Sequence, residues 1–159
     1  AGAEHVVVTG TLSKAFGSQG GAVLSSPDIR EHLVNTARPF IYDTGLAPAA
    51  AGAALAALGV LADHPELLDR LGATAARLAE ACGVPAPAGA VMSVRMPGPH
   101  EAVATVERAR AHGIRIGCFR PPSTPDGSSR LRLTAHADLG DADLERACSV
   151  LDTLVPDHG

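Results

Sequence analysis

The sequence contains a single lysine, Lys14, although thirteen of its residues are lysine or arginine. Arginine can replace lysine in most surface roles, but its guanidinium group does not lose a proton in proteins. A lysine is required where a neutral amine must act as a nucleophile, for example to form an imine with a carbonyl compound. The count alone leaves two alternatives open, a catalytic amine and an ordinary surface residue.

Small and hydroxylated residues surround Lys14. Thr11 and Ser13 precede it and can donate hydrogen bonds to a phosphate group, while the glycine-rich stretch 17–21 would leave room for a flat ring. Two common phosphate-binding loops do not fit. GxxxxGK must be followed by Ser or Thr, where this chain has Ala15, and the glycine spacing differs from GxGxxG. The remaining interpretation is a loop that presents an imine-forming lysine beside a phosphate site.

Three arginines form a second group of candidate functional residues. Arg130 and Arg132 alternate with two leucines, so on a strand both guanidinium groups would lie on one face. A planar guanidinium can hold a carboxylate with two hydrogen bonds. Arg120 precedes two prolines, which restrict the local backbone. We interpret Arg130 as solvent-exposed or ion-paired, and for Arg120 an ordinary loop arginine remains an equal alternative.

Three segments together resemble a known family. Residues 9–21, TGTLSKAFGSQGG, are similar to the Schiff-base signature of class II pyridoxal-phosphate aminotransferase-like enzymes. Residues 38–48, RPFIYDTGLAP, resemble the segment that follows it in the α-oxoamine synthases, and residues 120–134, RPPSTPDGSSRLRLT, resemble their C-terminal substrate motif. The three motifs occur in the family's order and spread over most of the chain, so the resemblance is to the α-oxoamine synthase family.

This resemblance implies roles for five residues. Lys14 matches the lysine that binds pyridoxal 5'-phosphate and later moves the α-proton of the substrate. Thr11 matches a threonine near the cofactor phosphate, and Thr44 matches a hydroxyl residue that reaches the phosphate of the neighbouring subunit in a homodimer. Arg132 matches the arginine that holds the amino-acid carboxylate, and Arg120 matches a second arginine near that carboxylate.

The resemblance also implies a reaction. The stretch GCFRPP at 117–122 favours family members that condense L-alanine with pimeloyl-CoA, with loss of CO2, in biotin biosynthesis. The alternatives are 2-amino-3-ketobutyrate CoA ligase, serine palmitoyltransferase or 5-aminolevulinate synthase, which use other acyl-CoA substrates. A non-catalytic α/β fragment is a further alternative of a different class.

The fold implied by the resemblance is part of the PLP-transferase fold type I. Because the family's enzymes are more than twice as long, we expect a C-terminal fragment that is inactive alone. Residues 1–60 would be the end of the large PLP-binding domain, and residues 61–159 a small C-terminal α/β domain. The histidine and aspartate that contact the cofactor ring in the family would lie in the missing part.

Alternating strand and helix patterns independently predict an α/β class. The apolar run 5–9 is typical of a buried parallel strand, and 38–48 is predicted to be a connector. The core stripe expected of the helix over 65–82 is Leu67, Leu68, Leu71, Ala75, Leu78 and Cys82. Further strands are predicted over 22–25, 90–96, 114–118 and 130–134, and further helices over 27–37, 49–62, 101–112 and 141–154.

Composition excludes several classes of function. The net charge is −4 and aromatic residues make up 3% of the chain, so neither a basic surface nor stacking residues favour a nucleic-acid partner. No apolar run reaches membrane-spanning length and no secretory signal is recognised, which predicts a cytoplasmic protein. Three widely spaced cysteines and scattered histidines predict no metal site.

Overall fold

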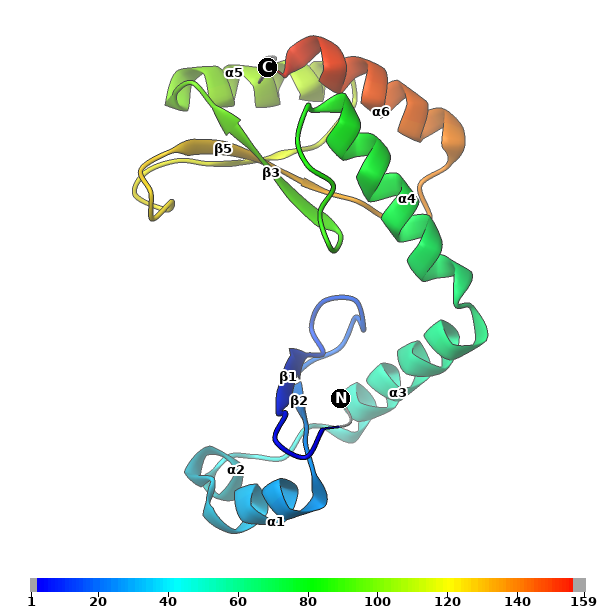
Figure 1. The fold of residues 1–159 in the computed structure, drawn as a ribbon, viewed down its shortest axis with the longest axis vertical. Helices are drawn as coiled ribbons and strands as arrows, with labels where there is room; N and C mark the ends of the chain where they lie inside the picture. Colours follow the sequence, from blue (N-terminus) through cyan, green and yellow to red (C-terminus); the bar gives the residue numbers. More distant parts are fainter. Residues whose placement is uncertain (1–2, 156–159) are drawn as a thin grey trace. The chain divides into compact units, whose positions relative to one another are not determined.

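The computed structural model describes residues 3–155, which divide after His64 into two compact units (Figure 1). Unit 1 contains a hairpin of two strands and three helices, and unit 2 contains a three-stranded sheet and three helices. Strands and helices of both units give the α/β class that the sequence predicts. No helix in the described part of the chain is long and apolar enough to cross a membrane.

The hairpin of unit 1 pairs β1 (Val8–Thr11) with β2 (Gly21–Leu24). The pairing is antiparallel, and most of the strand residues are exposed, so the expectation of a buried parallel strand is wrong. The connection, residues 12–20, is shorter than the dozen or more residues that a parallel crossover requires. An antiparallel return is therefore the arrangement that this loop allows.

Three helices follow the hairpin. The helix α1 (Pro27–Thr36) begins as predicted, with Ser26 as the N-cap whose hydroxyl accepts a hydrogen bond from the Ile29 N–H at 3.5 Å. The predicted connector instead contains a short helix, α2 (Arg38–Tyr42), with proline in its first turn. The long helix α3 (Pro48–Asp63) completes the unit.

The sheet of unit 2 is antiparallel throughout. Its strands are β3 (Val91–Met96), β4 (Gly117–Phe119) and β5 (Ser129–Thr134), in the order β3-β5-β4. The central strand β5 therefore pairs on both sides. β4 is shorter than the predicted strand and begins three residues later.

One face of this sheet is covered by helices. These are α4 (Glu66–Ala81), α5 (Pro99–Ala111) and α6 (Asp141–Leu154), which lie together on the same side of the strands in Figure 1. Two of the helices end at the predicted glycines, because Gly83 and Gly113 adopt positive φ angles of 62° and 76°.

Burial alternates along the strands and defines the core. Met92, Val94 and Met96 of β3 and Leu131 and Leu133 of β5 are buried against the helices. The helices contribute Ala75, Leu78, Ala79, Ala102, Leu144 and Leu151, and Cys82 directly after α4 joins the same core. Leu71, Ala75, Leu78 and Cys82 of the predicted stripe belong to the core or pack against it, whereas Leu67 and Leu68 do not, and Leu68 is 61% exposed.

Candidate functional site

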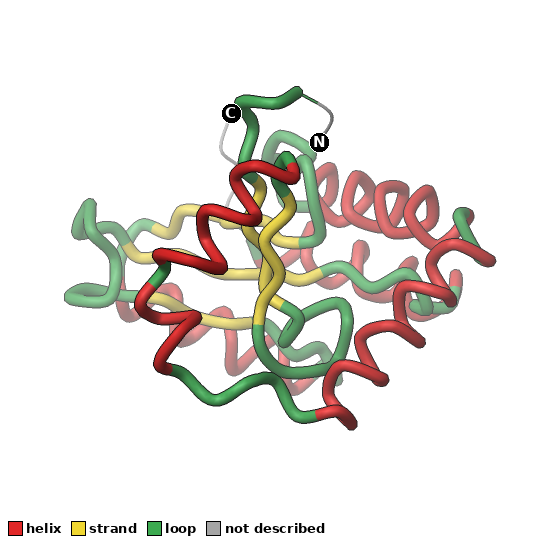
Figure 2. Tube along the Cα trace, turned by 90° about the horizontal axis from the view of Figure 1, so that it is seen from below, coloured by secondary structure: helices red, strands yellow, loops and turns green. Residues whose placement is uncertain are grey.

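Lys14 lies in the loop that joins β1 and β2, which is drawn in green in Figure 2. Main-chain hydrogen bonds close this loop: the Leu12 N–H donates to the Gly20 carbonyl and the Ser18 N–H to the Leu12 carbonyl, both at 2.9 Å. A turn in which the Gly17 N–H donates to the Lys14 carbonyl, also at 2.9 Å, follows the lysine. The side chain of Lys14 is exposed, so its amine is accessible to a small molecule.

Two hydroxyl groups lie side by side at the start of this loop. The Oγ1 of Thr11 and the Oγ of Ser13 are 2.7 Å apart, and the Ser13 N–H donates to the Thr11 hydroxyl at 3.2 Å. Both residues are exposed. Hydroxyl and main-chain N–H donors in a turn are the groups that commonly bind phosphate oxygens.

Close neighbours explain why glycine occupies positions 20 and 21. Gly20 has a φ of 84°, and a Cβ at this position would come within 3.0 Å of the Leu46 Cδ1. A Cβ on Gly21 would meet the Gly10 carbonyl at 3.1 Å. Leu46 therefore packs closely on the lysine loop, and it follows the predicted cofactor residue Thr44 by two positions.

Thr44 itself is exposed, and its N–H donates to the Asp43 carboxylate at 2.8 Å. A second link joins the lysine loop to the start of α3, because the Ser18 hydroxyl donates to the Ala50 carbonyl at 2.6 Å. The segment that carries Thr44 is thus held near the lysine loop through Leu46 at one point and Ser18 at another.

These features fit pyridoxal phosphate. The exposed Lys14 comes just after Thr11 and Ser13, two exposed hydroxyl residues whose oxygens lie 2.7 Å apart, and Gly17 and Gly20 leave the loop without side chains at their positions. The amine has the chemistry to bind an aldehyde, and the hydroxyls have the chemistry to bind a phosphate.

Unit 2 carries two of the candidate arginines on the open face of its sheet, the face opposite the helices. Arg130 and Arg132 lie on this face and the two leucines of β5 on the other, as the alternation predicts. Arg132 is exposed, and its guanidinium carbon lies 5.8 Å from the centroid of the Phe119 ring. Ser93 of β3 and Gly117 of β4 are its direct cross-strand neighbours.

Arg130 is held by neighbouring side chains. Its Nη2 pairs with an Asp126 carboxylate oxygen at 2.6 Å, and its Nε donates to the Ser128 hydroxyl at 2.9 Å. Ser128 also donates to Asp126 through its N–H and its hydroxyl. The hydrogen bonds from Arg130 and Ser128 hold the pKa of the Asp126 carboxyl well below its usual range. The ion-paired interpretation of Arg130 is therefore confirmed.

Arg120 follows β4 and is exposed at the start of the proline-rich loop. Its carbonyl accepts a hydrogen bond from the Ser123 N–H at 2.8 Å, which makes a turn at this point. In the same loop the buried hydroxyl of Thr124 has no hydrogen-bond partner. The sequence prediction did not include Thr124, Phe119 or the Asp126–Ser128 cluster. The acid four residues before Arg130 was the available signal for the last of these.

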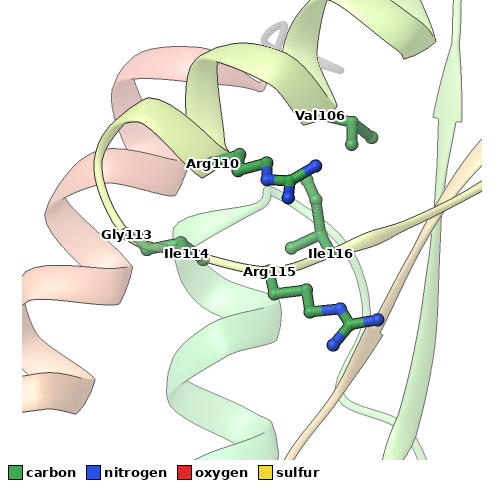
Figure 3. A pocket seen from close by; sticks show the side chains of 6 residues that line it. All are labelled: Val106, Arg110, Gly113, Ile114, Arg115 and Ile116. Carbon is green, nitrogen blue, oxygen red and sulfur yellow. The ribbon is translucent and has the colours of Figure 1, made fainter.

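A hollow of about 400 Å³ lies where the C-terminal end of α5 turns towards β4 (Figure 3). In Figure 3 the side chains of Arg110 and Arg115 extend on either side of Ile116. Arg110 belongs to the last turn of α5, where a positive charge stabilises the helix end. The five predicted site residues do not line this hollow. Among residues 3–155, no group of three or more His, Cys, Asp or Glu side chains is arranged to hold a metal ion.

The structure therefore places the five predicted residues in two groups. Lys14, Thr11 and Thr44 belong to unit 1, and Arg120 and Arg132 belong to unit 2. Each group has a chemistry of its own: the first contains an amine and hydroxyls, and the second contains two exposed guanidinium groups, a type of group suited to binding a carboxylate.

Relatives of known name are similar to most of this chain. The 8-amino-7-oxononanoate synthases of Mycobacterium sp. (strain JLS) and Mycolicibacterium gilvum (strain PYR-GCK) are 57% and 53% identical to it over 95% and 98% of its length. The matched regions are 40% and 41% of those proteins, so the chain spans about two fifths of the curated relatives' length.

Solved structures of PLP enzymes share the fold. The 8-amino-7-oxononanoate synthase of Francisella tularensis matches 93% of this chain and 45% of its own, with a TM-score of 0.76 and 25% identity. A structure of SPT with a PLP internal aldimine matches 93% of this chain and 39% of its own, with a TM-score of 0.82 and 25% identity. The serine palmitoyltransferase of Sphingomonas wittichii has the same TM-score and coverage at 24% identity.

The expected fold is thus confirmed, since the chain matches part of several PLP-dependent fold type I structures. The family model described as aminotransferase class I and II matches residues 1–151. This chain belongs to the aminotransferase class I and II family.

Proposed function

We propose that this sequence forms the lysine-bearing and carboxylate-binding part of a PLP-dependent acyltransferase. The enzyme condenses L-alanine with pimeloyl-CoA, with loss of CO2, to give 8-amino-7-oxononanoate in biotin biosynthesis. The observation that carries this proposal is the 53–57% identity to relatives of that name across nearly the whole chain. The proposal includes a cytoplasmic location and a homodimer, which the resemblance implies.

In this proposal Lys14 has two roles. Its ε-amine would hold pyridoxal phosphate covalently, and the same amine, once released by the incoming amino acid, would take the proton from the substrate α-carbon. The hydroxyls of Thr11 and Ser13 would donate hydrogen bonds to the phosphate, and Thr44 would do so for the phosphate of the neighbouring subunit. The cofactor supplies the electron sink that stabilises a carbanion at the substrate α-carbon.

The arginines would position the amino acid. Arg132 is exposed and has no ion pair within the described part of the chain, so its N–H groups are available to a carboxylate. Arg120 would provide a second positive charge near that carboxylate. Fixing the substrate in this way lowers the entropy cost of proton transfer and of attack on the thioester.

We further propose that these 159 residues are inactive alone. In the family the ring-binding aspartate and stacking histidine lie outside the three motifs present here, and none of the residues of this chain matches them. Without an aspartate at the ring nitrogen, stabilisation of the carbanion would be largely lost.

The test begins with the mass of the protein before and after incubation with pyridoxal phosphate and borohydride, which reduces an imine to a stable amine. In the full-length protein we expect one cofactor fixed on Lys14, identified by peptide mapping, and no adduct in the Lys14→Ala variant. The Lys14→Arg variant keeps the charge and is the matched control, with no adduct and no turnover expected. Full turnover by Lys14→Ala would contradict the assignment.

A second candidate is another α-oxoamine synthase, in particular serine palmitoyltransferase. The TM-score of 0.82 to SPT, against 0.76 to the Francisella enzyme, is the observation that favours it. Mass analysis of the products from L-alanine with pimeloyl-CoA and from L-serine with palmitoyl-CoA separates the two. A protein that forms no adduct and no product with either pair would instead fit the non-catalytic alternative.

A further inference from the structure

We propose that Phe119 is a positioning residue for Arg132, whose guanidinium its ring holds in place for the substrate carboxylate. The inference rests on the proposed carboxylate-binding role of Arg132. It assigns a function to a residue at the edge of the sheet that carries no polar group of its own.

The strand register explains how the two side chains meet. Phe119 of β4 lies directly opposite Arg130, and Gly117 lies directly opposite Arg132. Phe119 and Arg132 are therefore diagonal neighbours on the same face, within reach of an aromatic side chain. Gly117 lies beside both residues and has no side chain. A Cβ added to Gly117 would lie 3.6 Å from the Phe119 ring and 3.6 Å from the Arg132 Cβ. The ring reaches the guanidinium across this glycine, 5.8 Å from centroid to guanidinium carbon.

The neighbouring arginine shows why this contact differs from an ion pair. Arg130 lies on the same strand and face, but Asp126 and Ser128 occupy its Nη2 and Nε donors. An aromatic ring attracts a guanidinium through its π electrons and does not use the N–H groups as a carboxylate does. Arg132 is thus restrained by a contact that leaves its donors available, whereas Arg130 has already bound a carboxylate of this chain.

A restrained arginine binds a carboxylate more tightly than a mobile one, because less rotamer freedom is lost on binding. Cation–π contacts at exposed sites contribute on the order of 0.5–1 kcal/mol, which corresponds to about a two- to fivefold change in a dissociation constant. The effect should fall on the amino acid and not on the acyl-CoA, since only the amino-acid carboxylate is assigned to Arg132.

The experiment compares variants of the full-length protein loaded with pyridoxal phosphate. The dissociation constant of L-alanine is measured from the absorbance of the cofactor, and the KM for pimeloyl-CoA is measured separately. For Phe119→Leu we expect the dissociation constant of L-alanine to rise about two- to fivefold, with the KM for pimeloyl-CoA unchanged. Phe119→Tyr keeps the aromatic ring, so this variant should bind L-alanine as tightly as the parent protein does. Val91→Ala removes an exposed apolar side chain from the same sheet face and should leave both values unchanged.

A double-mutant cycle separates positioning from a general structural effect. Arg132→Met removes the charge and the fork-shaped donor, so it should weaken L-alanine binding strongly and abolish the cation–π contact. In that background Phe119→Leu should add little, because the two residues act through one contact. Equal effects of Phe119→Leu in both backgrounds would overturn the inference, as would unchanged or tighter L-alanine binding in the single variant.

The same data distinguish this inference from the proposed function. If Arg132→Met weakens L-alanine binding and Phe119→Leu does not, the inference fails and the role of Arg132 stands. If Arg132→Met leaves L-alanine binding unchanged, the proposed role of Arg132 fails, and the inference fails with it.

Discussion

Two arginines on one strand show how neighbours decide what a residue type can do. Arg130 and Arg132 share a strand, a face and a charge. A turn that contains Asp126 and Ser128 engages the first through an ion pair and a hydrogen bond, whereas the second contacts an aromatic ring. The alternation of residues in the sequence predicts the common face but not this difference, because Asp126 is brought back to Arg130 by the path of the intervening turn.

The Asp126 cluster leads to a prediction about pH. The hydrogen bonds from Arg130 and Ser128 lower the pKa of Asp126 below the ordinary value of about 3.9. A carboxyl with a depressed folded-state pKa stabilises the fold above its unfolded-state pKa, and this stabilisation is lost as the pH falls through the folded-state pKa. We expect Asp126→Asn to lower the urea midpoint of unfolding at pH 5–7, with a difference from the parent that shrinks below about pH 4.

The control for this measurement is Asp138→Asn, which removes one exposed carboxylate from the loop before α6. It changes the net charge equally without touching the Arg130 cluster. If the Asp126→Asn and Asp138→Asn variants gave the same pH profile, the stabilisation would be a general charge effect and not a property of the ion pair.

At the scale of elements, glycine has opposite roles within and after one helix. Gly72 lies in the interior of α4, and Gly83 follows its C-terminal end with a φ of 62°. A Cβ at either position would meet no atom within 4 Å, so space does not distinguish the two sites. The backbone does, because only glycine adopts a positive φ without steric cost.

We therefore expect opposite effects of the same substitution. Gly83→Ala should lower the free energy of unfolding by about 1–2 kcal/mol, the cost of a left-handed conformation for alanine. Gly72→Ala should raise it by about 0.5–1 kcal/mol, because alanine favours a helix interior. Urea unfolding followed by circular dichroism measures both. A neutral or stabilising Gly83→Ala would contradict the assigned role of the turn.

Local signals explain which parts of the fold the sequence predicts. The start of α1 at Ser26 and the ends of α4 and α5 at glycine follow from capping and backbone preference, which act within a few residues. The exposure of Leu68 and the direction of β1 depend on which elements lie alongside, so periodicity alone does not give them. The short helix α2 is not predicted, because its five residues are too few to show a helical period.

In the candidate site, too, local sequence signals predict some features, and others depend on which elements lie alongside. The Lys14 loop and the arginine strand could be proposed from residue types and from a family resemblance carried by contiguous motifs. Their roles, and the assignment of the two units as parts of a large and a small domain, stay predictions. Phe119 could not be found in this way, because its contact with Arg132 depends on the register between β4 and β5.

At the scale of the whole molecule, the two units differ in how much apolar surface they bury. Within the described part of unit 1, Ala54 is the one buried core residue, whereas Phe40 and Tyr42 are 66% and 78% exposed. Unit 2 encloses a continuous core between its sheet and helices, with Val94 and Leu131 fully buried. Hydrophobic burial is the main source of stability, so in the 159-residue chain we expect unit 2 to be stably folded and unit 1 to unfold more readily.

Hydrogen exchange of the isolated chain tests this difference. The amides of Leu131 and Leu133 lie in a strand that is paired on both sides, and we expect them to exchange at least about 100-fold more slowly than those of the β1–β2 hairpin. An isolated two-stranded hairpin is at best marginally stable in water. In the full-length protein the hairpin amides should gain protection while those of β5 change little, because additional chain would cover unit 1. Equal protection of β5 and the β1–β2 hairpin in the isolated chain would contradict this prediction. It would show that unit 1 is stabilised by a contact other than its own core, such as self-association, which would make the exchange rate depend on protein concentration.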